Sequence, residues 1–129
     1  LMSSFTGYFF KNTNEVTISQ NADEHYTKFL SYITKDVNTD DLIYVKTGVN
    51  STDCIIFKFE TGIEHQYVFA NETIYYISIE NQNEKKVTMC ENVVKSANNI
   101  PIFSYENSKI DINFNIKEKN FSATLSVNI

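Results

Sequence analysis

The chain has 129 residues, of which 42% are hydrophobic and 14% aromatic, and its formal net charge is −5 at pH 7. This composition is typical of one globular domain and not of a disordered chain. The acidic balance argues against nucleic-acid binding, which needs cation-rich faces. No apolar run reaches the roughly 18 residues of a membrane-spanning helix. We expect residues 1–129 to be a single globular domain, either an excised ectodomain or a mature secreted chain.

The amino-acid usage is strongly biased. All eleven cationic side chains are Lys, sixteen residues are Asn and fifteen are Ile, while Arg and Trp are absent. Protein chemistry gives no reason to exclude Arg, which makes better bidentate contacts than Lys. The bias indicates an AT-rich coding sequence and favours a pathogen or parasite as the source. It also lowers the weight of motifs built on Asn, Lys or Tyr.

The N-terminal part predicts two short strands followed by a helix. Phe5–Phe10 and Val16–Gln20 have strand-like composition and flank a polar turn. Asn21 and Glu24 have the spacing of a capping box, so we expect a helix from there to about Lys35. Its apolar face is formed by Tyr26, Phe29, Leu30 and Ile33, at the i, i+3, i+4, i+7 spacing.

After Asp41 the apolar period changes from that of a helix to that of a strand. The predicted strands are Leu42–Val49, Cys54–Glu60, His65–Ala70, Thr73–Glu80, Lys86–Val94, Ile100–Tyr105, Ile110–Ile116 and Phe121–Ile129. The basic pair Lys85-Lys86 is predicted to lie in a solvated turn. Short connections and a single helix predict a mainly β fold: an antiparallel β-sandwich or closed β-barrel of about eight strands with one N-terminal amphipathic helix.

The two cysteines, Cys54 and Cys90, both fall in predicted strands. We expect them to form a disulfide bond, which would stabilise the fold by roughly 3–4 kcal/mol on the chain-entropy estimate. The alternative is two buried free thiols in a reducing cytosol.

Three sequons begin at Asn50, Asn71 and Asn120. Their number is what chance gives in a chain this rich in Asn, Ser and Thr. Their positions, at predicted turns or strand edges, suit glycosylation. Together with the paired cysteines they favour an extracellular protein, either secreted or the ectodomain of a cell-surface protein.

No residue pattern points to catalysis, and no cofactor is expected. His25 and His65 lack the sequence context of a Cys–His nucleophile, and no G-x-S-x-G turn is present. The segment Asp36–Asp41 imitates the start of a calcium loop. However, it has Asp41 where the loop needs Gly, and Thr47 where it needs Glu. We expect a polar connection there, without a metal.

The eight tyrosines are the remaining candidates for a binding surface, because Tyr offers a large rigid contact area with one polar end. Those predicted to contribute are Tyr67, Tyr75, Tyr76 and Tyr105. We therefore expect a non-enzymatic extracellular binding module that engages a protein partner, with a host–pathogen interaction as one setting.

The alternative is a carrier of a small apolar ligand. A helix followed by eight strands with a disulfide resembles, in topology only, the secreted lipocalin-like barrels. The chain has no Trp and so lacks their Gly-x-Trp start. A cavity would be lined by Phe57, Phe59, Tyr67, Phe69, Tyr76 and Phe114. A protease-inhibitor module of the helix-on-curved-sheet type is a third alternative, but the chain has neither a Gly-rich edge nor an inhibitory hairpin motif.

Overall fold

The computed structural model describes residues 14–49 and 52–129, with side chains described from Ala22 onward. In this part of the chain one helix, α2 (Asn14–Val37), precedes nine strands. The strands are β1 (Leu42–Thr47), β2 (Cys54–Phe59), β3 (Glu64–Ala70), β4 (Thr73–Glu80), β5 (Asn83–Glu91), β6 (Val93–Val94), β7 (Phe103–Glu106), β8 (Lys109–Ile116) and β9 (Lys119–Ser126).

The strands form two antiparallel sheets. Sheet A is a five-stranded meander in the order β1-β2-β3-β4-β5. In sheet B, β8 is the central strand: it pairs with β9 along its whole length, with β7 near its start and with β6 at its end. Because a strand has only two edges, β6 and β7 share the edge of β8 opposite β9.

Asparagine-initiated turns set the register of three hairpins. The two-residue loops Asn71-Glu72, Asn81-Gln82 and Asn107-Ser108 connect β3 to β4, β4 to β5 and β7 to β8. All six residues have φ between 52° and 68°. Positive φ at both central positions is the mark of a type I′ turn, whose twist matches that of the flanking strands. Asn adopts this conformation more readily than other non-glycine residues.

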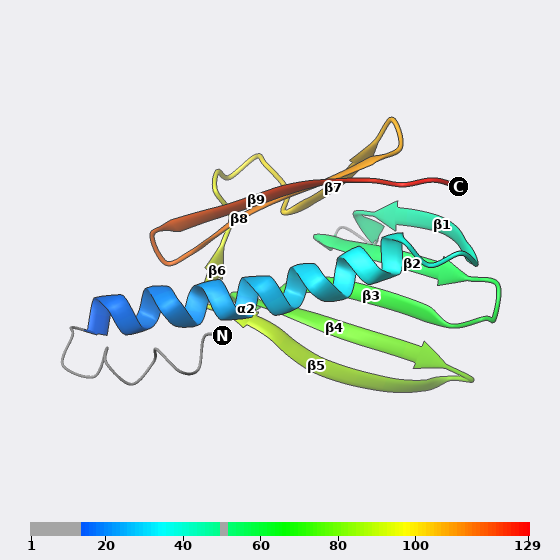
Figure 1. Ribbon diagram of the computed structural model, residues 1–129, viewed down its shortest axis with the longest axis horizontal. Helices are drawn as coiled ribbons and strands as arrows, with labels where there is room; N and C mark the ends of the chain where they lie inside the picture. Colours follow the sequence, from blue (N-terminus) through cyan, green and yellow to red (C-terminus); the bar gives the residue numbers. More distant parts are fainter. Residues whose placement is uncertain (1–13, 50–51) are drawn as a thin grey trace.

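Helix α2 lies between the two sheets (Figure 1). The sheets meet where β7 contacts β1 and β2, and α2 fills the space where they diverge. Phe29 shows this directly. Its ring centroid lies 5.8 Å from that of Tyr67 in sheet A, and 6.2 Å and 5.8 Å from those of Phe103 and Phe114 in sheet B. Phe29 therefore joins both sheets into one core.

The prediction of a mainly β fold with one helix is confirmed, and the arrangement resembles a sandwich. The closed-barrel alternative is wrong, because the chain forms two separate sheets. The apolar face of the helix is also confirmed. Phe29 and Ile33 are fully buried, and Tyr26 and Leu30 pack against the core.

The predicted start of the helix is wrong. Val16–Gln20 belongs to α2, not to a strand, and Asn21 lies within the helix instead of capping it. Intrinsic strand preference is a weak signal, and adding residues to an existing helix needs no new nucleus. The predicted strand Phe5–Phe10 lies outside the described residues. Among those that are described, no helix has both the length and the apolarity needed to cross a membrane.

The predicted disulfide is also wrong: Cys54 and Cys90 are both buried and free. Cys54 lies on β2 and Cys90 on β5, with β3 and β4 between them. Three strand spacings amount to about 14 Å, whereas a disulfide needs Cα atoms within about 7 Å. Cys90 also belongs to the core, and Cys54 does not.

Candidate functional site

The side of sheet A that faces away from α2 is an extended surface, which we call the outer face. The strand register assigns its residues to three rows that cross the sheet. These rows are Lys46, Ile56, Gln66, Ile77 and Lys86; Tyr44, Lys58, Glu64, Ile79 and Glu84; and Cys54, Val68, Tyr75 and Thr88.

An apolar centre occupies the middle strands of this outer face. It consists of Ile56, Val68, Tyr75, Ile77 and Ile79. All five side chains are half-buried by their neighbours in the sheet, and none belongs to the core. α2 and sheet B both lie on the other side of sheet A, and no described helix or strand covers the outer face (Figure 1). β4 therefore presents apolar side chains on both of its faces.

Two lysines flank the apolar centre. Lys46 Nζ lies 4.7 Å from the ring centroid of Tyr44, and Lys86 Nζ lies 4.1 Å from that of Tyr75. Both distances are within the range of a cation–π contact. Within the described residues, neither ammonium group has a carboxylate oxygen within 4.0 Å. Lys85 and Lys86 lie in β5, so the prediction that this pair forms a turn is wrong.

A second cluster lies under the C-terminal end of α2. Asp36 is only 5% exposed. Tyr67 Oη donates a hydrogen bond of 2.6 Å to its Oδ2, and His65 Nδ1 lies 2.9 Å from its Oδ1. Tyr76 packs against the rings of both residues: its ring centroid lies 5.2 Å from that of His65 and 5.2 Å from that of Tyr67. The cluster ties the end of α2 to β3 and β4.

Burial governs the electrostatics of this cluster. Desolvation raises the pKa of Tyr67 far above its usual range, and the nearby carboxylate of Asp36 adds to the effect. The pKa of Tyr76 is raised as well, mainly by burial and to a smaller extent by the charge of Asp36. Tyr67 therefore stays protonated and donates a hydrogen bond to the carboxylate of Asp36. This bond satisfies two polar groups that are both buried in the fold.

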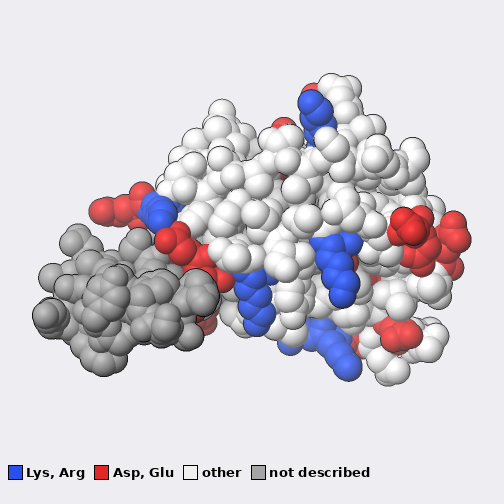
Figure 2. All heavy atoms as spheres, in the orientation of Figure 1, with Lys and Arg blue, Asp and Glu red and all other residues white. Residues whose placement is uncertain are grey.

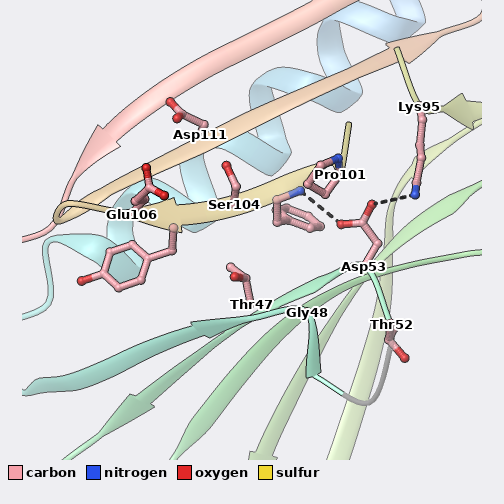
Figure 3. Close-up of a pocket in the computed structure, with 11 residues that line it drawn as sticks. Thr47, Gly48, Thr52, Asp53, Lys95, Pro101, Ser104, Glu106 and Asp111 are labelled. Carbon is pink, nitrogen blue, oxygen red and sulfur yellow. Dashed lines mark hydrogen bonds and ion pairs between the residues drawn. The ribbon is translucent and has the colours of Figure 1, made fainter. Parts of the chain in front are cut away.

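A polar pocket of about 500 Å³ opens at the seam between the sheets (Figure 3). Thr47 and Asp53 lie on the sheet A side, and Ser104, Glu106 and Asp111 on the sheet B side. An adjacent pocket of about 630 Å³ runs over sheet B and shares Pro101, Ser104 and Asp111 with the first.

Asp53 in this pocket holds the two sheets together. Its carboxylate accepts backbone hydrogen bonds of 2.8 Å from Ile102 N and 3.2 Å from Phe103 N. Lys95 Nζ lies 3.8 Å away. These contacts fix the start of β7 against β2. They occupy the Asp53 carboxylate, so it is better explained as a structural clamp than as a general base or a ligand-binding group.

The four tyrosines predicted to bind a partner lie in different places. Tyr67 is fully buried and bonded to Asp36, so it is not available at the surface. Tyr76 is half-buried on the inner side of sheet A, where its ring contacts Tyr32 at 5.2 Å. Tyr105 lines the polar pocket. Of the four, Tyr75 lies on the outer face of sheet A.

The structure does not bring the sequon residues together. Asn71 is exposed in the turn between β3 and β4. Asn120 is exposed on β9, where its side-chain nitrogen donates hydrogen bonds of 2.9 Å and 2.7 Å to Asn113 Oδ1 and Asn115 Oδ1. A glycan on Asn120 would disturb these bonds, whereas Asn71 has no such partner in the described part of the chain. Asn50 lies outside the described residues.

The first carboxylate of the calcium-like segment already has partners within the protein. The carboxylate of Asp36 is taken up by His65 and Tyr67. Throughout residues 22–49 and 52–129, no group of three or more His, Cys, Asp or Glu side chains is arranged to hold a metal ion.

The aromatic residues that would line a carrier's cavity are core residues instead. Phe57, Phe59, Tyr67 and Phe114 belong to the buried core, and Phe69 and Tyr76 pack against it. α2 occupies the space between the sheets where a barrel would have its lumen.

Charges on the side shown in Figure 2 are mixed. Acidic side chains gather toward the two ends of the molecule, and most of the lysines lie between them (Figure 2). This side offers no broad cationic patch of the kind that nucleic-acid binding uses.

Comparison with known proteins identifies no relative: no family model, no curated protein and no solved structure matches the chain.

Apart from Tyr75, the residues of the outer face of sheet A were not predicted from the sequence, although a signal for them exists. In β4, Tyr75, Ile77 and Ile79 alternate with Ile74, Tyr76 and Ser78, so both faces of the strand are rich in apolar side chains. An antiparallel strand with one wet face shows apolar–polar alternation instead. The run in β4 therefore indicates a strand that needs cover on both sides.

Proposed function

We propose that the chain is a protein-binding module and that the outer face of sheet A is its contact surface. The observation that carries the proposal is the apolar centre on a sheet face that no described helix or strand covers. Contiguous exposed apolar surface is typical of interaction sites. Protein interfaces combine such a centre, enriched in Tyr, with a polar rim, and Tyr75 and the flanking lysines fit that pattern.

The size of this face favours a limited contact. Five strands span about 19 Å, and three rows with their flanks span roughly 20 Å along the strands, which gives about 400 Å² in plan. A standard interface buries about 800 Å² per partner. A partner must therefore extend beyond the sheet edges, or bind weakly and transiently.

We propose that this contact forms outside the cell, although fewer observations support this setting than the sequence alone indicated. The exposed sequon at Asn71 supports it, while the absence of a disulfide removes one of its arguments. The pathogen or parasite source rests on coding bias alone. The packed core gives no support to a carrier function, so no second function is proposed.

The test places a charge in the apolar centre. Ile77→Lys adds a cation there, and Ser122→Lys adds the same cation at an exposed position on β9. Each tagged variant is expressed in cells of the source organism, its complexes are fixed with a chemical crosslinker, and their size is measured by gel filtration. Wild type and Ser122→Lys should elute well above the 14.9 kDa of the free chain, and Ile77→Lys should elute as the free chain. An unchanged large complex with Ile77→Lys, at an equal thermal midpoint, would contradict the proposal.

A further inference from the structure

We propose that the partner of the outer face of sheet A presents an apolar centre flanked by carboxylate groups, which Lys46 and Lys86 recognise. This inference rests on the proposed function and adds the chemistry of the partner to it.

The two lysines occupy opposite ends of one row. Lys46 lies opposite Ile56, Ile56 opposite Gln66, Gln66 opposite Ile77, and Ile77 opposite Lys86. The row thus starts on edge strand β1 and ends on edge strand β5. Four strand spacings separate the two Cα atoms by about 19 Å. The cations bracket the apolar centre at both sheet edges.

The third lysine of this face is already occupied. Lys58 Nζ lies 4.0 Å from a carboxylate oxygen of Glu64 and donates a hydrogen bond of 3.3 Å to the Gly62 carbonyl. Lys46 and Lys86 are exposed and have no carboxylate within 4.0 Å among the described residues. They are therefore the cations of this face that remain available for a partner's carboxylates.

The rings beneath these lysines restrain them. Each ammonium group lies over a tyrosine of the same face, Tyr44 for Lys46 and Tyr75 for Lys86. A lysine that is already held near its binding position loses less side-chain entropy when a carboxylate arrives. The same tyrosines would contribute apolar contact area next to the ion pair.

Charge complementarity favours this partner over two other occupants. A second copy rotated about an axis along β3 would place Lys46 opposite Lys86 of that copy, and like charges that face each other oppose association. An anionic lipid surface would attract the lysines, but it would repel a chain whose net charge is −5. An acidic rim on a protein can place carboxylates only where the two cations lie, so it avoids the contact between like charges and does not bring a broad anionic surface against the chain. Glu84, the exposed carboxylate of this face, lies in the next row and not beside the apolar side chains of the Lys46–Lys86 row.

The experiment uses a phage-displayed library of a small helical scaffold with its contact positions fully randomised. Binders are selected on wild-type protein and counter-selected on Ile77→Lys, so that the survivors require the outer face. We expect their contact positions to contain more Asp and Glu than Lys and Arg. Binding should weaken about two- to thirtyfold on the double variant Lys46→Glu/Lys86→Glu. The control Lys109→Glu/Lys117→Glu changes the net charge equally at exposed positions in and next to β8 and should bind like wild type.

The outcomes separate this inference from the proposed function. Survivors with neutral or basic contact positions, or equal losses on both double variants, would overturn the acidic partner and leave the binding face intact. A selection in which no clone distinguishes wild type from Ile77→Lys would overturn the proposed function itself. Two parallel measurements address the other occupants. Binding to vesicles with 30% phosphatidylserine that is lost in Lys46→Glu/Lys86→Glu, or a wild-type dimer that Ile77→Lys dissociates, would also overturn the inference.

Discussion

Lys86 and Tyr75 form a cation–π contact across two neighbouring strands, with Nζ 4.1 Å from the ring centroid. The contact joins the edge strand β5 to the apolar centre of the outer face of sheet A. It places a cation and an aromatic ring beside each other on a surface that no described element covers. This combination of groups is typical of the boundary between the centre and the rim of a protein interface.

The hydrogen bond between Tyr67 and Asp36 predicts a specific stability loss. Tyr67→Phe removes a donor from a buried carboxylate, which should lower the free energy of unfolding by about 1–3 kcal/mol. The matched control is Tyr105→Phe, because Tyr105 is half-buried and should change stability by no more than about 0.5 kcal/mol. Urea unfolding measures both variants. Equal losses would show that the hydrogen bond to Asp36 contributes nothing specific.

The free cysteines predict a simple thiol count. Because Cys54 and Cys90 are unpaired, protein purified without reductant and then denatured should give two reactive thiols per chain. The folded protein should react slowly, because both residues are buried and the reagent must reach a thiol before it can react with it. Titration with a thiol reagent before and after denaturation tests this. If the denatured chain has no reactive thiols, Cys54 and Cys90 form a disulfide bond and the structure's assignment of two free cysteines is wrong.

Cys90 also predicts a loss of stability at alkaline pH. Burial raises the pKa of its thiol to about 12, compared with about 8.5 in an unfolded chain. The folded state holds the proton more tightly, so this contribution is complete below about pH 8.5 and is lost as the pH rises toward 12. The raised pKa of Tyr67 acts in the same direction. The free energy of unfolding is measured by urea titration at several pH values in this range. That of Cys90→Ala should be lower than that of wild type at about pH 8.5 but should fall less steeply as the pH rises. Parallel declines would rule out Cys90 as a contributor.

The turn between β4 and β5 predicts a stabilising substitution. Gln82 has φ 68°, a conformation that costs a residue with a side chain roughly 1 kcal/mol and glycine nothing. Gln82→Gly should therefore raise the free energy of unfolding by up to about 1 kcal/mol. Glycine also increases the conformational entropy of the unfolded chain, which offsets part of this gain. Thermal unfolding should show a midpoint a few degrees higher. A lower midpoint would mean that the Gln82 side chain makes a stabilising contact.

Much of the fold could be predicted because the strands carry strong local signals. Thr73–Glu80 is β4 as expected, and the strand ends of β2 and β3 shift by one residue. The start of α2 could not be predicted, because residues 16–20 have strand-like composition and helix propagation overrides such preferences. The sequence does not specify which strands lie between Cys54 and Cys90, and the disulfide prediction failed on that point.

The site was harder to predict than the fold, because it depends on strand order. Lys46 and Lys86 are far apart in the chain and join one row only once β1–β5 form a meander. Tyr67 and Tyr75 look alike in the sequence, yet one is buried against Asp36 and the other lies on the outer face. Successive side chains of a strand point to opposite faces of the sheet, so the strand positions of Tyr67 and Tyr75 tell them apart only once it is known which face is buried.

The most direct test of the protein-binding face is photo-crosslinking in living cells of the source organism. A photoreactive phenylalanine analogue replaces Tyr75 or Ile77 on the outer face of sheet A, or Ser104 or Ser122 on sheet B. We predict that irradiation yields a discrete adduct of one mass, containing the same partner protein, from positions 75 and 77 and not from 104 and 122. Adducts of equal yield from all four positions, or adducts confined to sheet B, would contradict the assignment of the outer face of sheet A as the contact surface.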